Sequence, residues 1–356
     1  MTVLRVDGLV KHFVHARSVF GAATAHVRAV DGVSIEVGAG ETLALVGESG
    51  CGKSTVGRLA LRLIEPTAGT VHFDGVDVTN LSGGALRRFR SQAQLVFQDP
   101  YASLNPRMTI GQTLSEPLML HTNLGTVARR ARVAELLTLV GLRSEHAQRF
   151  PHEFSGGQRQ RIAIARALAA EPKLIVCDEP VSALDVSIRA QVLNLLQDLQ
   201  QRLGLAYIFI SHDLAVVKHI ADRVAVMYLG RVVESASAKS LFATPRHPYT
   251  QALLSAIPVP LPHANRVRRH MPGDPPSPVN PPSGCHLHPR CPHAAEICAT
   301  EVPLLQSAGD AHVVACHRWK DIRDLAAGGL PSPPPSLELA KLMAAFEMPG
   351  HIKSGT

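Results

Sequence analysis

The feature that most constrains this chain is a glycine-rich segment that directly follows an apolar run at residues 43–46. The segment fits the pattern G-x-x-x-x-G-K-[ST] and consists of Gly47, Glu48, Ser49, Gly50, Cys51, Gly52, Lys53, Ser54 and Thr55. In such a segment the glycines let backbone N–H groups turn inward around a polyphosphate, the lysine adds positive charge, and the serine hydroxyl ligates Mg²⁺. A flexible Gly/Ser loop is the alternative, but every fixed position is filled. The pattern therefore predicts a nucleotide-binding loop between a strand and a helix.

Length and composition indicate a folded chain with more than one domain. The 356 residues are 46% hydrophobic, which allows a sizeable buried core. No uncharged apolar run reaches the roughly eighteen residues of a membrane span, and residues 1–7 lack the basic-then-apolar layout of a signal peptide. We therefore expect a cytosolic protein. The formal net charge of +7 comes from scattered basic residues, and aromatic residues make up 4%. This combination favours a membrane surface over nucleic acid as the partner.

Short alternating apolar stretches at 4–6 and 33–37 predict antiparallel strands that flank the nucleotide site. Residues 13–28 between them are polar and small, which suggests a surface insertion. Phe13 in this stretch either stacks on an adenine ring or simply packs against its neighbours. Behind the loop, residues 56–63 predict a helix.

Four polar residues each follow an apolar, strand-like run: Gln98, Asp178, Glu179 and His212. In an open α/β sheet the carboxyl ends of strands are where ligand-facing groups collect. Asp178 is placed to hold Mg²⁺ through water, and Glu179 is placed to orient or deprotonate an attacking water. Acid pairs are usually solvated and a lone histidine at a strand end is usually structural. Two acids directly behind a buried strand are not both solvated. His212 completes the set of polar residues expected at the ligand edge of the sheet.

Between these strands lie a helical pattern and a second glycine-containing segment. Residues 106–150 show helical spacing of apolar residues. Ser155, Gly156, Gly157 and Gln158 precede a strongly helical run, and Asp185 lies in a short connector further on. A helix N-terminus with exposed N–H groups is an anion site, although Ser-Gly-Gly by itself is more often only a helix cap.

In this order and spacing, the motifs resemble those of the ATP-binding subunit of an ABC transporter over about residues 3–255. The glycine-rich loop is similar to the family's Walker A motif, Gln98 to its Q-loop glutamine, and residues 155–158 to its signature. Asp178 and Glu179 are similar to Walker B with the catalytic glutamate, Asp185 to the D-loop aspartate, and His212 to the switch histidine.

The resemblance implies an α/β fold with a P-loop NTPase (RecA-like) core, an antiparallel β subdomain, a helical subdomain at about 101–170 and a small Cys-rich C-terminal domain. It implies an ATPase that uses Glu179, His212 and Gln98 in catalysis. Mg²⁺ is expected on Ser54, Gln98 and Asp178. ATP is expected on the loop 47–55, with contributions from Phe13, the signature Ser155, Gly156, Gly157 and Gln158, and Asp185. In this family two cassettes sandwich ATP head to tail, so a second cassette is implied.

The C-terminal third narrows the resemblance. Residues 244–258, 273–278 and 281–285 look like the oligopeptide/dipeptide/nickel import branch, and within it the F-type ATPase that pairs with a D-type sister. The expected domains are 1–255 for nucleotide binding, 256–325 for the Cys-rich transporter-type domain, and 326–356 for a Pro-rich linker and tail.

Four of the six cysteines, Cys285, Cys291, Cys298 and Cys316, lie in one Pro- and His-rich segment. Clustered cysteines in a cytosolic chain suggest metal before disulfide. Their spacing lacks C-x-x-C and leaves free thiols and a metal site both open. The resemblance implies a [4Fe–4S] cluster, with Zn²⁺ as the alternative.

The other two cysteines belong to the nucleotide site. Cys51 lies near Lys53 at a helix N-terminus, which predicts a reactive thiolate that ATP protects from alkylation. Cys177 is expected to be an inert buried thiol.

The resemblance thus implies an ATP-hydrolysing subunit that powers peptide import, held peripherally on the cytoplasmic side of the inner membrane. The implied partners are a sister ATPase, two permeases contacted through residues 101–106, and indirectly a substrate-binding protein, without nucleic acid. The alternatives are import of another cargo such as nickel, a non-transport ATPase of the same superfamily, and an inactive regulatory or iron–sulfur module.

Overall fold

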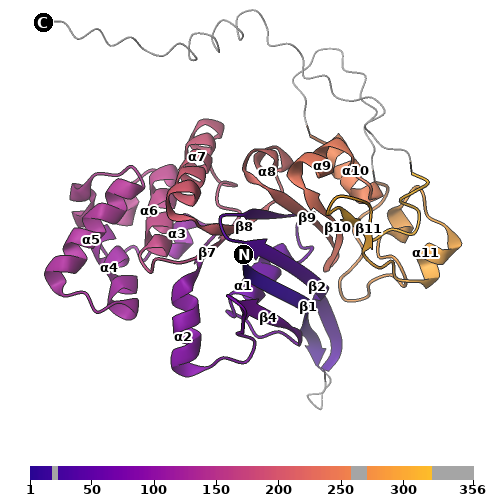
Figure 1. Ribbon diagram of the computed structural model, residues 1–356, viewed down its shortest axis with the longest axis horizontal. Coiled ribbons are helices and arrows are strands. Elements are labelled where there is room, and N and C mark those ends of the chain that lie inside the picture. Colours follow the sequence, from indigo (N-terminus) through magenta and orange to yellow (C-terminus); the bar gives the residue numbers. More distant parts are fainter. Residues whose placement is uncertain (18–22, 258–270, 323–356) are drawn as a thin grey trace, which may run out of the picture.

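The computed structural model describes residues 1–17, 23–257 and 271–322. The expected tail at 326–356 lies outside the described residues. Within the described ranges the strands form two sheets, one antiparallel and one mixed, and helices gather on one side and along the top of the mixed sheet (Figure 1).

The antiparallel sheet has the order β2-β1-β4-β5. Its strands are β1 (Thr2–Arg17), β2 (Ala23–Gly38), β4 (Ala68–Phe73) and β5 (Val76–Asp77). It provides the expected strands on both sides of the loop.

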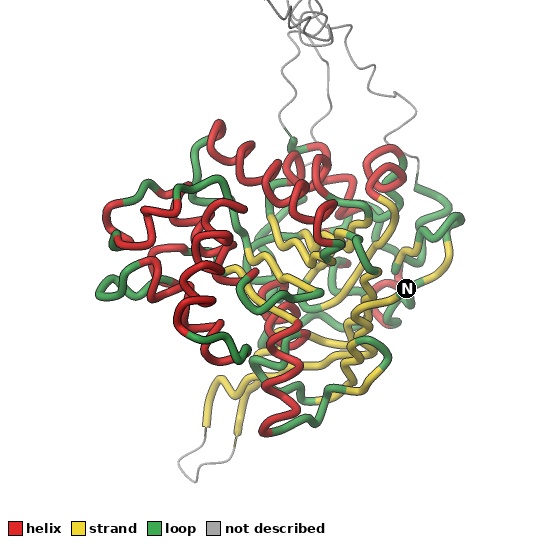
Figure 2. Tube along the Cα trace, turned by 60° about the vertical axis from the view of Figure 1, so that its left-hand side comes forward, coloured by secondary structure: helices red, strands yellow, loops and turns green. Residues whose placement is uncertain are grey.

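The surface insertion expected at 13–28 is, in the described part of that range, a continuation of the β1–β2 hairpin. β1 and β2 stay paired there, with Phe13 opposite Val27 and His12 opposite Arg28. Figure 2 shows the outer end of this hairpin projecting from the body. Backbone pairing needs no apolar side chains, so a polar stretch continues a hairpin whose faces meet solvent. The tip at 18–22 lies outside the described residues.

The mixed sheet has the order β11-β12-β10-β9-β3-β8-β7-β6. Its strands are β3 (Thr42–Val46), β6 (Ala93–Val96), β7 (Leu174–Asp178), β8 (Ala206–Ser211), β9 (Arg223–Tyr228), β10 (Arg231–Ser237), β11 (Gln306–Ser307) and β12 (Val313–Val314). The centre is parallel, whereas the pairings of β10 with β9, of β12 with β10 and of β11 with β12 are antiparallel. Every residue of β3, β7 and β8 is buried, which explains their continuous apolar runs, since both faces are covered.

Helix α1 (Lys53–Ala60) follows the loop and packs between the two sheets, in one apolar core with Leu4, Val30 and Ile208. It begins three residues earlier than the sequence predicts, because Gly52, at φ 105°, makes the sharp turn that lets the helix start at Lys53. Helix α2 (Gly83–Gln92) contacts β6, the edge strand of the mixed sheet.

The helical subdomain is built around α6 (Gly156–Leu168). The other elements on this side are α3 (Pro100–Ser103), α4 (Ile110–His121), α5 (Thr126–Leu139), α7 (Val186–Leu203) and the 3-10 turns η1 (Ser144–Gln148) and η2 (Pro151–Glu153). Their buried residues form one core that includes Leu114, Leu137 and Ile164. The helical pattern predicted at 106–150 is confirmed, and α5 ends just before Gly141, which has φ 73°.

Towards β9 and β10, on the face that also carries α7, the mixed sheet is covered by α8 (Leu214–Ile220), α9 (Ala238–Ala243) and α10 (Pro248–Ser255). The C-terminal segment, defined here as residues 271–322, carries η3 (His288–Arg290), α11 (Glu296–Thr300) and the strands β11 and β12. It lies beside β10, at the right of Figure 1.

A buried carboxylate joins the C-terminal segment to the body. Glu234, fully buried in β10, accepts hydrogen bonds from the backbone N–H groups of Arg246 (2.6 Å) and His247 (3.0 Å) and pairs with Nε2 of His312 at 2.7 Å. The Nδ1 atom of His312 lies 3.2 Å from the Ser240 hydroxyl. A buried carboxylate needs such hydrogen-bond partners, so removal of His312 would leave Glu234 with one partner fewer in the interior.

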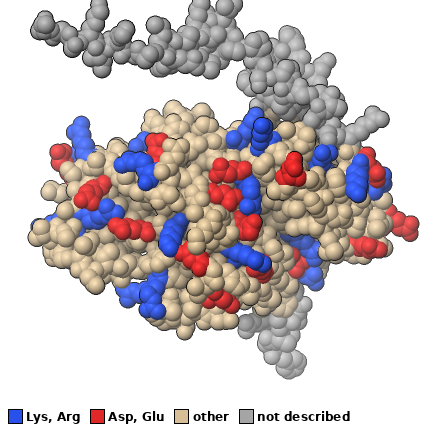
Figure 3. All heavy atoms as spheres, in the orientation of Figure 1, with Lys and Arg blue, Asp and Glu red and all other residues tan. Residues whose placement is uncertain are grey.

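Charges of both signs are interspersed on the face shown in Figure 3, with no broad field of one sign. This agrees with the scattered basic residues of the sequence. None of the helices in the described part of the chain has the length and apolar character needed to span a bilayer.

Candidate functional site

The carboxyl ends of the parallel strands bring the candidate residues to one edge of the sheet. Val46, the last residue of β3, is in register with Ser211 at the end of β8, and Asp178 of β7 is in register with Ile210. The residues that follow these strands, namely Gly47, Glu179 and His212, therefore meet at the same edge. This is where an open parallel sheet places its ligand site.

The loop 47–55 has a backbone that only glycine adopts at two positions. Gly47 has φ 151° and a Cβ there would lie 2.2 Å from the carbonyl oxygen of Met227. Gly52 has φ 105° and a Cβ there would lie 2.1 Å from the carbonyl oxygen of Ala29. The buried Lys53 donates from Nζ to the carbonyl oxygens of Gly47 (2.8 Å) and Glu48 (2.9 Å). Its ammonium therefore sits inside the loop, where a bound phosphate would meet it.

Ser54 and Asp178 are joined directly. The Ser54 hydroxyl donates to Oδ1 of Asp178 at 2.7 Å, and Asp178 is buried. A hydroxyl and a carboxylate oxygen side by side are ligands that suit Mg²⁺, which takes its remaining positions from phosphates and water. These residues therefore fit a Mg²⁺ ion that arrives with a nucleotide.

The three predicted catalytic residues form one cluster. Nε2 of Gln98 donates to Oε2 of Glu179 at 2.9 Å, and Nδ1 of His212 lies 3.1 Å from Oε1 of the same carboxylate. Glu179 has φ 48°, in the left-handed region that non-glycine residues rarely adopt. Such backbone strain persists where surrounding structure holds it, often at active sites. A carboxylate held in this way can accept a proton from a water molecule.

The predicted signature lies at the start of α6 and not in the loop. Ser155 and Gln158 form a capping box, in which the Ser155 hydroxyl accepts from the Gln158 N–H at 3.3 Å and Oε1 of Gln158 accepts from the Ser155 N–H at 3.0 Å. Helix α6 packs against α3, α4, α5, α7 and strand β6, in one apolar core, whereas α1 packs against β1, β2, β7 and β8 in another. The signature and the loop thus begin helices in different layers of the chain.

Gly156 and Gly157 pack against the connector that carries Asp185. A Cβ at Gly157 would lie 2.3 Å from Cγ2 of Ile188, and one at Gly156 would lie 3.5 Å from Cδ2 of Leu184. Asp185 is the N-cap residue of α7. The signature and the D-loop are therefore in contact within one chain.

Phe13 lies on β1 and pairs with Val27 of β2, two residues before Ala29, whose carbonyl oxygen faces Gly52 of the loop. The Phe13 side chain is 39% exposed, and Nζ of Lys11 lies 5.2 Å from the ring centre. The exposed ring is open to an external partner such as a base, and the stacking role stays a prediction.

Two residues that the sequence analysis did not single out also touch the loop. The Glu48 N–H donates to Oη of Tyr249 at 2.8 Å, and the Arg290 guanidinium pairs with the Glu48 carboxylate at 3.2 Å. They are separated from Glu48 by 201 and 242 residues, so no local pattern indicates the contacts.

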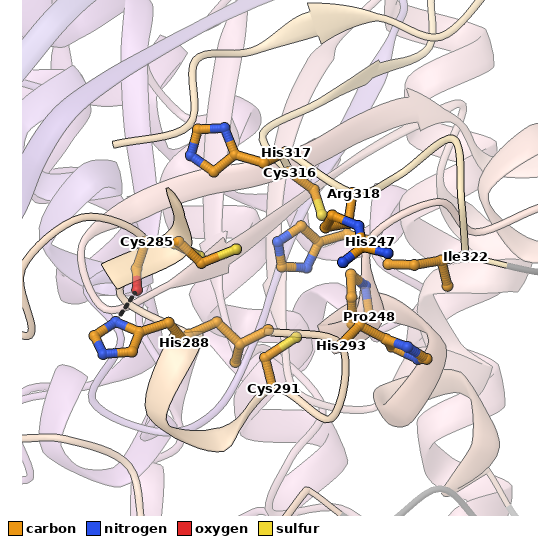
Figure 4. Close-up of a pocket in the computed structure, with 12 residues that line it drawn as sticks. His247, Pro248, Cys285, His288, Cys291, His293, Cys316, His317, Arg318 and Ile322 are labelled. Atoms are coloured by element: carbon orange, nitrogen blue, oxygen red, sulfur yellow. Dashed lines mark hydrogen bonds between the residues drawn. The ribbon is translucent and has the colours of Figure 1, made fainter. Parts of the chain in front are cut away.

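The four clustered cysteines line one small pocket in the C-terminal segment, together with His247, His288 and Ile322. Figure 4 shows the sulfur atoms of Cys285, Cys291 and Cys316 turned toward the same space. Burial, together with a smaller effect of the neighbouring Cys285, Cys291 and Cys298, raises the pKa of the Cys316 thiol to about 12. Burial also raises the pKa values of the Cys285 and Cys291 thiols above their ordinary value.

The donor set fits a metal centre in its chemistry but not in its spacing. Four convergent thiols are the ligands of an iron–sulfur cluster or a structural zinc. Among the described residues, however, no three His, Cys, Asp or Glu side chains are arranged as a ready site for a metal ion. Binding of an iron–sulfur cluster or a zinc ion would thus require the side chains around the pocket to move.

The structure contradicts the expectation of a reactive Cys51. Its Sγ lies 3.8 Å from Nζ of Lys53, but the residue is only 5% exposed. Burial raises the pKa of this thiol despite the positive charge of Lys53, which also bonds two carbonyl oxygens. Cys177 is fully buried, and burial raises its pKa strongly, as expected of an inert thiol.

Comparison with known proteins gives two family matches. Residues 30–182 match the model of the ABC transporter family, and residues 233–298 match the model described as the oligopeptide/dipeptide transporter C-terminal region.

Full-length relatives carry related names. The chain is 54% identical over 353 residues to the probable peptide ABC transporter ATP-binding protein y4tS of Sinorhizobium fredii, covering 99% of this chain and 97% of that protein. It is 53% identical to the di/tripeptide transport ATP-binding protein DppF of Pseudomonas aeruginosa, covering 89% and 97%. It is 52% identical to the oligopeptide transport ATP-binding protein AppF of Bacillus subtilis, covering 89% and 98%.

Solved structures share the fold of the body. The ATP-binding cassette MJ0796, in a dimeric post-hydrolysis state bound to ADP and Pi, matches with a TM-score of 0.59 at 28% identity, covering 66% of this chain and 98% of that one. The cassette cbiO1 of Clostridium perfringens, part of the ABC transporter complex cbiONQ, matches with a TM-score of 0.58 at 29% identity, covering 68% and 91%.

The burial of Cys51 predicts slow alkylation in the nucleotide-free chain. Only the thiolate reacts, and the raised pKa lies above the ordinary value of 9.0, so the rate should keep rising with pH beyond 9. We expect iodoacetamide to modify Cys51 at neutral pH more slowly than in the unfolded chain, since a raised pKa lowers the thiolate fraction and burial restricts access to the sulfur. Mass spectrometry of the Cys51 peptide measures this, with Cys177 as the slow internal reference. Equal rates in folded and unfolded chain at pH 7 would contradict the prediction.

Proposed function

This chain belongs to the ATP-binding proteins of the ABC transporter family, and from that premise we propose that its hydrolysis of ATP powers the import of peptides. The P-loop NTPase fold and the ATPase activity expected from the sequence are confirmed by the family and structural matches. The peptide cargo is supported by relatives named as peptide, di/tripeptide and oligopeptide transport proteins, and by the match at 233–298. The observation that carries the proposal is the joint presence of that match and an intact Glu179 cluster in one chain.

ATP and Mg²⁺ fit the residues at the sheet edge. The backbone amides of the loop and the ammonium of Lys53 would bind the phosphates, and Ser54 and Asp178 would hold Mg²⁺. Mg²⁺ supplies neutralisation of the charge that develops on the γ-phosphate. Gln98 is a further candidate ligand of the ion, since its side chain is bonded to Glu179, the residue that follows Asp178.

Glu179 is the proposed base. Its carboxylate is held from two sides by Gln98 and His212, which fixes the oxygen atoms at the edge of the sheet. A water between this carboxylate and the γ-phosphate would be oriented for in-line attack. His212, with a side chain 57% exposed, is available to contact the transferring group once Glu179 turns to the water.

A partner cassette is part of the proposal. Ser155 caps α6 in the helical layer, whereas the loop 47–55 of the same chain begins a helix in another layer. The signature would therefore serve ATP held by a second cassette, through Ser155, Gly156, Gly157 and Gln158. Asp185 adjoins the signature and would lie at the same interface. We propose that this second cassette is a related sister ATPase.

The membrane partners follow from the transport role. We propose two permeases, which the exposed Tyr101 and the neighbouring residues of 101–106 would contact, and indirectly a substrate-binding protein. The chain would then be peripheral, on the cytoplasmic side of the membrane. Nucleic acid is not among the proposed partners.

We also propose that Cys285, Cys291, Cys298 and Cys316 hold a [4Fe–4S] cluster. The support is the convergence of four cysteines on one pocket. The cluster would tie together parts of a segment with little regular structure. Zn²⁺ is the alternative occupant.

The transport role is tested in proteoliposomes. The chain is purified together with the permeases and the second ATPase encoded by neighbouring reading frames, and uptake of labelled di- and oligopeptides is followed. We expect peptide uptake that depends on ATP and is lost in Lys53→Ala, which removes the phosphate-binding ammonium. Uptake of nickel alone, or ATP hydrolysis without association with any permease, would favour the alternative functions.

Glu179→Gln should separate binding from chemistry. We expect Mg-ATP to bind with close to the parental affinity, while turnover falls by about a hundredfold or more, the usual loss when a general base is removed. Binding of a fluorescent ATP analogue and phosphate release measure the two steps. Glu145→Gln, on the exposed turn η1, is the matched control and should keep parental turnover. Hydrolysis by Glu179→Gln at the parental rate would refute the role.

The cluster predicts iron in the full chain. Anaerobic purification should give a brown protein with about four iron atoms per chain, and Cys291→Ser should lose most of the iron and colour. Cys177→Ala, which changes a cysteine of the parallel sheet, should keep both. A colourless chain with one zinc would support the alternative, and a chain without metal would reject both occupants.

A further inference from the structure

Arg290 of the C-terminal segment makes a complete set of contacts around the loop. Nη1 and Nη2 form a fork on the Glu48 carboxylate, with Nη1 at 3.2 Å from Oε2 and Nη2 at 3.4 Å from Oε1. Nη1 also donates to Oη of Tyr228 at 3.3 Å, and Nε donates to the carbonyl oxygen of Pro272 at 3.2 Å. The side chain of Arg290 is only 8% exposed. The Glu48 side chain is 29% exposed, so the forked pair is partly buried, and its two parallel contacts set both the direction and the distance between the groups.

Glu48 is held through its backbone as well. Its N–H donates to Oη of the fully buried Tyr249, and its carbonyl oxygen accepts from Nζ of Lys53. The rings of Tyr249 and Tyr228 pack edge to face, 4.8 Å apart. The carbonyl partner Lys53 lies in the loop itself, whereas the N–H and the side chain of Glu48 are held by Tyr249 and Arg290 from the far end of the chain.

The same two groups adjoin the cysteine pocket. Arg290 immediately precedes Cys291, at the end of η3, and Tyr249 follows His247 and Pro248, which line the pocket. The backbone of η3 is tied to Cys285, whose carbonyl oxygen accepts from the His288 N–H. A rearrangement of the pocket therefore displaces the residues that hold Glu48.

The negative charge of Glu48 indicates that its contact with Arg290 favours nucleotide binding. A free carboxylate in a phosphate-binding loop repels the bound polyphosphate and competes for Lys53, and like charges at short range in a partly buried site interact strongly. In the structure the Glu48 side chain is neutralised by Arg290 at the rim of the loop.

We propose that Arg290 is a positioning residue for nucleotide binding, which neutralises and orients Glu48 and thereby couples the phosphate-binding loop to the four-cysteine pocket. The inference rests on the nucleotide site proposed above and adds the regulation of that site. Coupling of this kind is reciprocal, so nucleotide binding also biases the pocket.

The test measures the dissociation constant of a fluorescent, non-hydrolysable ATP analogue with Mg²⁺ on the full chain. Arg290→Gln should weaken binding by about fivefold or more, within the usual range of coupling between sites. Arg290→Lys should lose less, since it keeps the charge without the fork. The double variant Glu48→Gln/Arg290→Gln should recover affinity, because the unpaired carboxylate is gone.

Recovery in the double variant separates positioning from a merely structural role. If Arg290 only stabilised the fold, removal of a second partner would not restore affinity. Arg223→Gln is the matched control, since Arg223 pairs with Glu41 at the opposite end of β3, and it should bind as the parent does. Melting temperatures of all variants confirm that folded chains are compared. Parental affinity in Arg290→Gln, or a loss that persists in the double variant, would overturn the proposal.

The link to the pocket is tested with Cys291→Ser. It should change nucleotide affinity in the parental chain but not in the Arg290→Gln background, because the connection is already broken there. Unchanged affinity in the parental chain, or an equal change in both backgrounds, would overturn the link. If the parental chain itself failed to bind the analogue, the proposed nucleotide site would fail with it, whereas parental binding with unresponsive variants rejects this inference alone.

Discussion

The site depends on the parallel pairing of β3, β8 and β7. These strands end level with one another, so the loop after Val46, the acids after Cys177 and the histidine after Ser211 meet at one edge. A shift of one residue in either ladder would exchange the faces of a strand that is buried on both sides. The tight apolar packing above and below the strands excludes such a shift. The hydrogen bond from Ser54 to Asp178 is a consequence of this register, because it joins the residues behind two different strands.

Much of this could be predicted because the signals are local. A loop that requires glycine at Gly47 and Gly52, an apolar strand that ends in Asp178, and a Ser155 to Gln158 capping box each follow from a few consecutive residues. Gln98 and His212 follow from the same rule about strand ends. The boundaries of α1 and the length of the first hairpin were less predictable, since backbone geometry and pairing, not side-chain polarity, decide them.

The rest depends on contacts across long separations in the chain. Nothing near Cys51 in the sequence shows that it is buried, so the proximity of Lys53 suggested a thiolate where desolvation dominates. Likewise no pattern around Glu48 points to Arg290, or around Glu234 to His312. In both pairs a carboxylate of the body meets a cation or histidine of the C-terminal segment. The Glu234–His312 pair is buried and the Glu48 side chain is 29% exposed, and in such surroundings each partner offsets part of the desolvation cost of the other. Both pairs make the C-terminal segment part of the ATPase body.

The pairing of β12 with β10 has a further consequence for the solubility of the chain. β10 is a seven-residue strand with mostly buried residues, and residues 313–315 bond the middle of its outer edge at 233–235, which would otherwise be open to other molecules. An exposed strand of that length is a template for intermolecular β-pairing and aggregation. β12 and β11 replace it at the margin with two residues each, and both residues of β11 are exposed. A chain shortened before residue 306 would thus be prone to self-association even if its nucleotide site were intact.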